Sequence, residues 1–174
     1  IPFLDPEVYG RSILENSSFI ASTVHPDRNV HGRGFVSRLT GASAEFLTMW
    51  IFMVAGRKPF HINNKGELCL ELKPVLPGWL FTEEETRVTI YENMEPKELI
   101  FGKDTFAFMF LGKVLAVYHN PNRKDTYGRN AAKIERIEIH RDGRVINIDG
   151  GVITLPYSKE IREGKIDRLD IYLA

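Results

Sequence analysis

The sequence predicts an α+β fold in which a helical N-terminal part precedes an antiparallel β-sandwich. Residues 42–55 form an almost uninterrupted apolar segment of helical length, and Gly56 is placed to end it. From Pro59 onward apolar and polar residues alternate in about eight short segments with turn formers between them, a pattern typical of sandwiches. We therefore expect a helical unit over residues 1–57 and a C-terminal β-sandwich domain over residues 58–174.

The helical part begins with a short predicted helix at Asp5-Pro6-Glu7, which Gly10 stops. Residues 25–34 are rich in turn formers and predict a long loop. The helix over 42–55 is apolar on nearly every side, so we expect it to be buried and to need further helical neighbours. Its polar interruptions are Ser43, Glu45 and Thr48.

The sandwich part contains clear strand and turn signals. Alternation over residues 68–72 follows the Asn-Asn-Lys-Gly turn, and Asp142-Gly143 predicts a tight hairpin. Residues 106–111 are apolar on both faces, which predicts a central strand. Alternating residues 169–173 form the last strand.

Composition narrows the functional classes. The chain has 174 residues, of which 43% are hydrophobic, and its 23 basic residues balance 23 acidic ones. This balance argues against a nucleic-acid or anionic-membrane partner. The single cysteine, Cys69, excludes an internal disulfide framework and predicts a reducing, cytoplasmic location. The chain opens on Ile rather than Met, so we expect an excised piece of a longer protein, with a tag-cleaved product as the alternative.

The junction of loop and helix at Thr40-Gly41 is the best candidate site in the sequence. A helix's first turn presents unpaired N–H groups and a partial positive charge, so it binds anions. Thr40 adds a hydroxyl, Gly41 allows close approach, and Arg33 and Arg38 lie near in sequence. The alternative is packing alone, in which small residues let one helix cross another.

Other polar candidates are weaker. His25, Asp27 and His31 match no zinc spacing, so we interpret them as loop residues and assign no metal. Glu45 is either a buried catalytic carboxylate or, as we favour, a partner of the helix dipole or of Arg38.

Two tryptophans have faces suited to the apolar faces of sugar rings. We expect Trp50 to be a core residue because it has helical spacing with Phe46 and Val54. We expect Trp79 to be partly exposed. The basic stretch 122–133 is interpreted as a solvated hairpin loop, and no complete active site is visible.

Two stretches, DPEVYGRSILENSSFIASTVHPDRNVHGRGFVSRLTGASAEFLTMW and GELCLELKPVLPGWLF, resemble the C-terminal part of inverting glycoside phosphorylases. The group is that of cellobiose phosphorylase, and the resemblance is closest to the branch acting on 1,2-β-linked glucose oligomers. It covers roughly residues 5–81. The matched positions of the second stretch are Gly66, Leu68, Pro74, Leu76, Pro77 and Trp79.

The resemblance implies that residues 1–57 are the last helices and loops of an (α/α)6 catalytic barrel, followed by the sandwich. The family's phosphate-binding Thr-Gly step falls on Thr40 and Gly41. The family's Gly-Trp corresponds to Gly34-Phe35. Its Trp-Tyr before Thr-Gly is replaced by Arg38-Leu39, so no sugar-binding residue is assigned.

The implied reaction is phosphorolysis of β-linked gluco-oligosaccharides to α-glucose 1-phosphate, with inorganic phosphate as co-substrate and no cofactor. The general acid and the other phosphate ligands are implied upstream, so no catalytic residue is assigned and the isolated chain is expected to be inactive. The implied partners are oligosaccharide, phosphate and the remainder of the same polypeptide, and a homodimer is compatible with the resemblance.

Two alternatives stay open. In the first, the chain is a non-catalytic carbohydrate-binding or structural β-sandwich domain. In the second, it is an unrelated anion-binding domain that uses Thr40 and Gly41. A fragment should expose an apolar patch that absent helices would cover, whereas a self-contained module should have a polar exterior.

Overall fold

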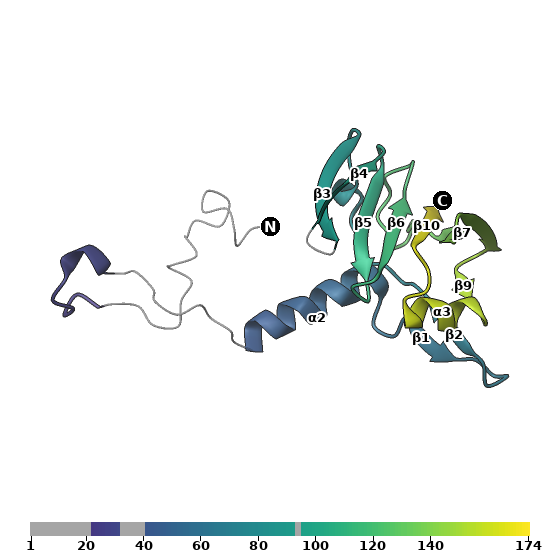
Figure 1. The fold of residues 1–174 in the computed structure, drawn as a ribbon, viewed down its shortest axis with the longest axis horizontal. Helices are drawn as coiled ribbons and strands as arrows, with labels where there is room; N and C mark the ends of the chain where they lie inside the picture. The colour runs from purple at the N-terminus through teal and green to yellow at the C-terminus, as the bar shows by residue number, and fades with distance from the viewer. Residues whose placement is uncertain (1–21, 32–40, 93–94) are drawn as a thin grey trace. The chain divides into compact units, whose positions relative to one another are not determined.

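The computed structural model describes residues 22–31, 41–92 and 95–174 (Figure 1). The chain divides into two compact units, residues 1–49 and residues 50–174. The described residues contain two α-helices and three sheets, an α+β arrangement in which most strand pairs are antiparallel. No helix among them is long and apolar enough to cross a bilayer.

In the first unit, the segment 22–31 is a series of turns around the 3₁₀-helix η2 (Arg28–Val30). Asp27 caps η2, because its carboxylate accepts a 2.9 Å hydrogen bond from the Asn29 N–H. The helix expected at Asp5–Gly10 lies outside the described residues. Helix α2 (Gly41–Ala55) begins in the first unit and ends in the second, close to its predicted bounds.

The C-terminal end of α2 is anchored by the following chain. Gly56 has φ +88°, and its N–H donates to the Phe52 carbonyl, which confirms the predicted stop. The Lys73 N–H donates to the Ala55 carbonyl at 3.1 Å, and the Val75 N–H donates to the Met53 carbonyl at 2.7 Å. Carbonyls that a helix end would leave unpaired are thereby satisfied.

The second unit contains the three sheets. A three-stranded sheet has the order β1-β2-β9: β1 (Phe60–Ile62), β2 (Leu68–Glu71) and β9 (Val152–Ile153). A five-stranded sheet has the order β5-β6-β10-β7-β8: β5 (Thr105–Phe110), β6 (Val114–His119), β10 (Arg168–Leu173), β7 (Ile134–Arg141) and β8 (Arg144–Asp149). Strands β3 (Thr86–Glu92) and β4 (Glu95–Phe101) form a separate two-stranded ribbon. The remaining elements are η3 (Gly78–Leu80) and α3 (Tyr157–Glu163).

Two expectations about the sheets are wrong. Strands β6 and β10 pair in parallel, so the sheets are not purely antiparallel. Strand β5 lies at an edge of the five-stranded sheet rather than in its centre. It is apolar on both faces because Phe106, Phe108 and Phe110 pack against the core, and because Ala107 and Met109, together with Phe106 and Phe108, line a groove beside the β3–β4 ribbon.

The turn predictions were more accurate. Asp142 and Gly143 both have positive φ, 49° and 71°, and connect β7 to β8 with Arg141 opposite Arg144. Gly66 has φ +79° in the turn between β1 and β2, where the Asn63 side chain accepts from the Lys65 N–H. Both turns depend on residues that tolerate left-handed backbone.

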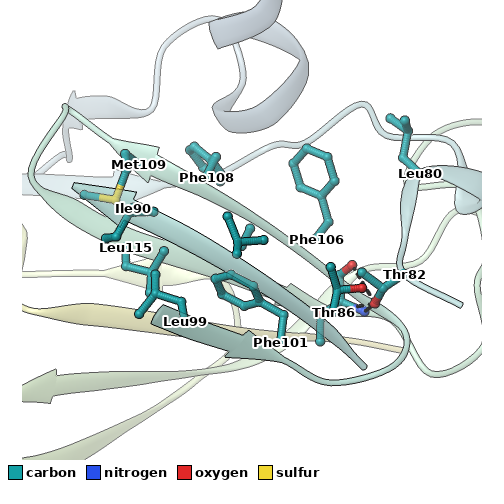
Figure 2. Close-up of a pocket in the computed structure, with 13 residues that line it drawn as sticks. Leu80, Thr82, Thr86, Ile90, Leu99, Phe101, Phe106, Phe108, Met109 and Leu115 are labelled. Atoms are coloured by element: carbon teal, nitrogen blue, oxygen red, sulfur yellow. Dashed lines mark hydrogen bonds between the residues drawn. The ribbon is translucent and has the colours of Figure 1, made fainter. Parts of the chain in front are cut away.

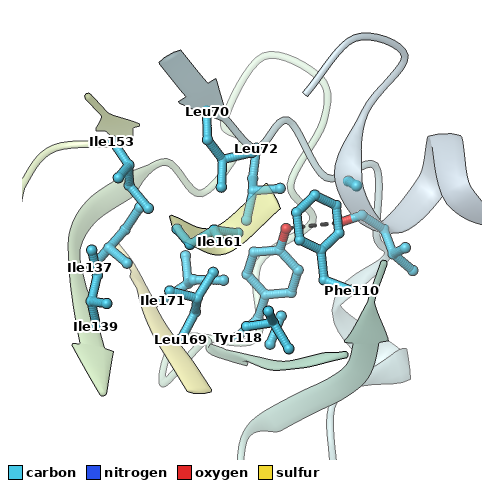
Figure 3. Packing of buried hydrophobic residues seen from close by; sticks show 14 of the residues in the cluster. Leu70, Leu72, Phe110, Tyr118, Ile137, Ile139, Ile153, Ile161, Leu169 and Ile171 are labelled. Carbon is cyan, nitrogen blue, oxygen red and sulfur yellow. Dashed lines mark hydrogen bonds between the residues drawn. The ribbon is translucent and has the colours of Figure 1, made fainter. Parts of the chain in front are cut away.

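The core lies on one face of the five-stranded sheet (Figure 3). Ile137, Ile139, Leu169 and Ile171 point from β7 and β10 toward side chains of β2, β9 and α3. That covering layer is formed by Leu70 of β2, Leu72 just after β2, Ile153 of β9 and Ile161 of α3. Cys69 is also buried and free, with its Sγ 3.8 Å from the Glu67 carbonyl oxygen.

Candidate functional site

The predicted phosphate-binding pair is only half described. Thr40 lies outside the described residues, as do Arg33 and Arg38. Gly41 is the first residue of α2, and the first turn of this helix carries no acidic residue. The backbone at Gly41 therefore has the position at a helix N-terminus that the sequence predicted.

The other polar candidates make local contacts. His31 Nε2 lies 2.8 Å from the His25 carbonyl oxygen, and the Asp27 N–H donates to His25 Nδ1 at 3.1 Å. These side chains stabilise the turn over 22–31 and are exposed or half-buried. Glu45 is exposed on α2, which contradicts a buried catalytic carboxylate.

Of the two tryptophans, one differs from expectation and the other agrees with it. Trp50 is 39% exposed, with its ring centroid 6.0 Å from that of Phe106, so its expected place in the core is wrong. In the same helical row, Phe46 is 46% exposed and Val54 is 2% exposed, so the predicted apolar cover is present only at the C-terminal end of α2. Trp79 is 75% exposed, which confirms the expected exposure.

A cluster of seven polar side chains occupies the outer face of the five-stranded sheet, opposite the core. Each member alternates with core residues along its strand, so strand pairing brings together positions far apart in sequence. We call this set the outer-face cluster: His119, Arg136, Glu138, His140, Arg168, Asp170 and Tyr172.

Asp170 is the centre of this cluster and is only 3% exposed. Its Oδ1 accepts from His119 Nε2 at 2.6 Å and from an Arg168 Nη2 at 2.6 Å. Its Oδ2 accepts from Arg168 Nε at 2.7 Å and lies 2.8 Å from His140 Nε2. Burial opposes ionisation of Asp170, but the hydrogen bonds from His119 and Arg168 outweigh it and lower its pKa to about 2.

A second carboxylate in the cluster, Glu138, is held in a similar way. It accepts from Arg136 and from the Tyr172 hydroxyl, the latter at 3.0 Å. The Arg136 guanidinium also lies over the Tyr172 ring, 3.5 Å from its centroid. The His119 ring stacks on the Tyr172 ring, with 4.5 Å between the two ring centroids. Burial and the bond to Glu138 both raise the pKa of Tyr172.

The chemistry of this cluster is that of a charge-balanced network. Ligand atoms of Glu138, His140 and Asp170 lie within 4.8 Å of one another, a spacing that a metal ion could use. However, Arg136 and Arg168 already neutralise the two carboxylates, so a divalent cation would add uncompensated positive charge beside two guanidinium groups. The cluster also contains no Ser, Thr, Cys or Lys that a histidine could activate. We therefore assign it a structural role.

An apolar groove of about 260 Å³ lies between the β3–β4 ribbon and strands β5 and β6, and side chains from both faces of β5 line it (Figure 2). Its walls carry Ile90, Leu99, Phe101, Met109 and Leu115. At one end the hydroxyls of Thr82 and Thr105 both donate to the Gly102 carbonyl. With those hydroxyls bonded within the protein, the groove offers few polar groups that would orient a ligand.

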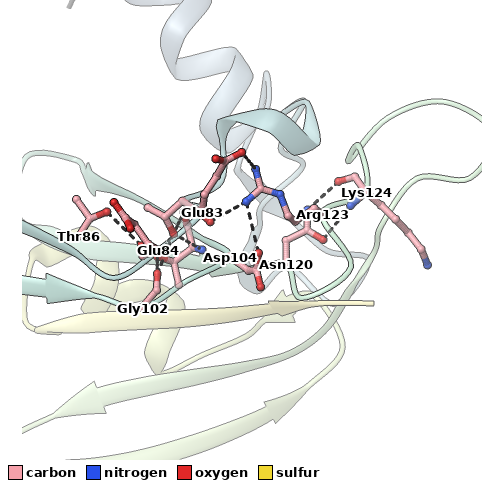
Figure 4. Close-up of polar contacts among 10 residues, drawn as sticks. Glu83, Glu84, Thr86, Gly102, Asp104, Asn120, Arg123 and Lys124 are labelled. Atoms are coloured by element: carbon pink, nitrogen blue, oxygen red, sulfur yellow. Dashed lines mark hydrogen bonds and ion pairs between the residues drawn. The ribbon is translucent and has the colours of Figure 1, made fainter.

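The loop 120–126 is fixed to the segment 74–84 by hydrogen bonds of Arg123, Asp125 and Thr126. Figure 4 shows the Arg123 part of this contact, beside Glu83 and Asp104. Arg123 donates to the Thr82 carbonyl at 2.9 Å and to Glu83 at 3.3 Å, and its Nη1 lies 3.5 Å from Asp104 Oδ1. Asn120 closes the loop internally by donating to the Lys124 carbonyl at 2.7 Å. The stretch 122–133 is mostly exposed, as expected, but it connects β6 to β7, which are not neighbours in the sheet, so the expected hairpin loop is wrong.

No protein-family model matches the chain, and no curated protein matches it either.

Proposed function

We propose that this chain is part of an inverting β-glucoside phosphorylase, to which it contributes one wall of the phosphate site and a C-terminal β-sandwich. The residues 5–81 that resemble such enzymes support this proposal. So does helix α2, which begins at Gly41, where the resemblance puts the phosphate-binding step.

The observation that carries the proposal is the apolar surface of α2. Leu47, Met49 and Ile51 are 62%, 60% and 51% exposed, although most residues of the helix are apolar. A helix of this composition is stable when other helices cover it. Its C-terminal end is anchored in the second unit by backbone hydrogen bonds, as expected of a barrel helix that leads into a following domain.

In the proposed reaction, a phosphate oxygen attacks the anomeric carbon of the terminal glucose. The glycosidic C–O bond breaks as a carboxylic acid protonates the departing oxygen, and the product is α-glucose 1-phosphate with inverted configuration. The N–H groups of the first turn of α2 and the Thr40 hydroxyl would hold the phosphate dianion. The acid is proposed to come from a part of the polypeptide outside this chain, so the chain alone would be inactive.

The test is the variant Thr40→Val in the enzyme that contains this chain. Loss of one hydrogen bond to a charged group should raise the KM for phosphate about tenfold or more. The KM for the oligosaccharide should change little, because the proposal assigns this hydroxyl to phosphate and not to the sugar. The exposed Thr89, changed to Val, is the matched control. An unchanged phosphate KM would remove Thr40 from the site, and absence of phosphorolysis in the parent enzyme would reject the proposal.

A further inference from the structure

Strand β8 forms one edge of the five-stranded sheet, and on its outer side it pairs with no strand of the described part of the chain. Arg144 flanks the two-residue turn at Asp142-Gly143 and lies opposite Arg141, so its N–H and C=O point toward β7. The Gly150 N–H also points toward β7 and donates to the Glu135 carbonyl at 2.6 Å. Because the direction alternates along a strand, three residues point their backbone groups away from β7. We call them the β8 edge: Val145, Asn147 and Asp149.

The β8 edge lacks the features that usually prevent pairing with another strand. Such features are proline, a β-bulge and charged side chains, lysine above all. Strand β8 contains no proline or lysine, and it pairs with β7 along its whole length without a shift in register. Its charged residues are Arg144 and Asp149, one at each end, and Val145 between them is 50% exposed. The edge is therefore regular, exposed and able to accept a further strand.

The geometry of the β8 edge suits pairing with a second copy of itself. In an antiparallel pair related by a two-fold axis, residues whose backbone groups point outward lie opposite one another. The centred register places Asn147 opposite the partner's Asn147, and Val145 opposite the partner's Asp149. This register uses all three residues of each edge. A shift by two residues in either direction would leave one of them beyond the end of the partner's strand.

The side chains brought together in this register are compatible on both faces of the sheet. On the core face, Ile146 and Ile148 are only partly buried, and pairing places each beside the other in the partner. The isoleucines that line β7 and β8 thus continue into the second copy and gain apolar cover. On the outer face, the two Asn147 amides can bond to each other. The positive end of each strand, at Arg144, lies beside the negative end of the other, at the partner's Asp149, and no like charges are opposite.

We propose that two copies of this chain associate through their β8 strands, which joins the two five-stranded sheets into one continuous sheet with its two-fold axis at Asn147. The self-complementary charges and isoleucines identify the occupant of the edge as a second copy. Neither phosphate nor sugar takes part, so this inference does not depend on the proposed function.

The test is analytical ultracentrifugation of the 174-residue chain over a range of concentrations. All proteins carry Leu47→Lys and Ile51→Lys, so that the exposed face of α2 does not contribute to association. This parent should form a dimer. Adding Asn147→Lys places two ammonium groups opposite each other at the axis and should raise the dimer Kd about tenfold or more. Within one copy the new lysine lies opposite Glu138, so the monomer should remain folded, which circular dichroism checks.

A charge reversal locates the axis. Asn147→Glu should weaken the dimer as Asn147→Lys does, whereas an equal mixture of the two variants should dimerise at least as well as the parent, because opposite charges then meet. Thr89→Lys is the matched control and should leave the dimer Kd unchanged, since Thr89 is an exposed strand residue opposite Glu98 in the β3–β4 ribbon.

A parent that sediments only as a monomer would overturn the proposal, because the edge would then not attract a second copy. A dimer that Asn147→Lys leaves unchanged would place the contact elsewhere on the molecule, and a mixture that stays monomeric would show that the two Asn147 residues do not face each other. Either result rejects the proposal. No substrate enters these measurements, so their outcome is independent of the phosphate KM that tests the proposed function.

Discussion

The Tyr118 hydroxyl donates a 2.7 Å hydrogen bond to the Val54 carbonyl oxygen, and this bond joins the five-stranded sheet to the last turn of α2. Tyr118 is fully buried, and Val54 is 2% exposed. Burial raises the pKa of Tyr118 far above its usual value, so the hydroxyl keeps its proton and remains a donor. The bond therefore fixes the direction in which α2 leaves the sheets, because a helix carbonyl has few other partners in an apolar core.

We expect Tyr118→Phe to destabilise the chain. The change keeps the ring, which stacks on Phe108, but it leaves the Val54 carbonyl buried without this donor. The free energy of unfolding should fall by about 1–3 kcal/mol, as for other buried polar groups that lose their partner. This free energy is measured by urea unfolding with circular dichroism as the signal. Tyr127→Phe, at an exposed tyrosine, should shift the midpoint little.

A second prediction concerns Gly78. Alanine at this position would place its Cβ 1.9 Å from the Arg123 carbonyl oxygen, and backbone atoms cannot move aside as a side chain can. Gly78→Ala should therefore lower the free energy of unfolding by more than about 2 kcal/mol. Gly102→Ala is the matched control, because a Cβ there meets nothing within 4 Å. If thermal unfolding shows the two variants to be equally stable, the turn that carries Trp79 is not rigid.

Features that depend on a few neighbouring residues could be predicted from the sequence. The stop of α2 at Gly56 and the hairpin turn at Asp142-Gly143 both follow from the left-handed backbone that these residues accept. The exposure of Trp79 agreed with its place in a Pro-Gly segment. Helix α3 was not predicted, because its two turns bury only Ser158 and Ile161 and give little periodic signal.

Features that depend on which strands meet could not be predicted. The apolar faces of β5 indicated a central strand, but the same pattern arises at an edge when a separate ribbon lies beside it. The outer-face cluster was missed for a related reason. Polar residues alternate with Ile137 and Ile139 in β7 and with Leu169 and Ile171 in β10, which was a usable signal of opposite charges on one face. Their meeting with His119 requires the parallel pairing of β6 and β10.

Asp170 predicts a specific dependence of stability on pH. Its pKa is about 2 in the folded chain and near 3.8 when unperturbed, so the folded state favours the ionised form. The resulting stabilisation, about 2 kcal/mol, is complete above about pH 5 and is lost as the pH falls through 4 toward 2. Urea unfolding between pH 2 and pH 6 should show this loss in the parent chain and not in Asp170→Asn.

The exposed Asp142, changed to Asn, is the control for that experiment, because it removes a carboxylate from the surface at a turn position where Asn is well tolerated. This variant should keep the parent's dependence on pH. A parallel decline in Asp170→Asn and the parent would show that other carboxylates cause the acid sensitivity.

The exposed face of α2 gives the last prediction. Leu47 and Ile51 are one turn apart, and both are more than half exposed. In the 174-residue chain, the double change Leu47→Lys, Ile51→Lys should alter the free energy of unfolding by no more than about 1 kcal/mol, because each lysine remains in water. It should also reduce self-association in size-exclusion chromatography, because it interrupts an apolar surface.

In the longer enzyme, where we propose that other helices cover this face, the same change should lower the free energy of unfolding several times more, since it would bury two unpaired charges. Val54→Lys, at a buried position of the same helix, should be severely destabilising in both proteins. If the double variant is tolerated equally well in both, α2 is exposed in the enzyme as well, and the observation on which the proposed function depends has another cause.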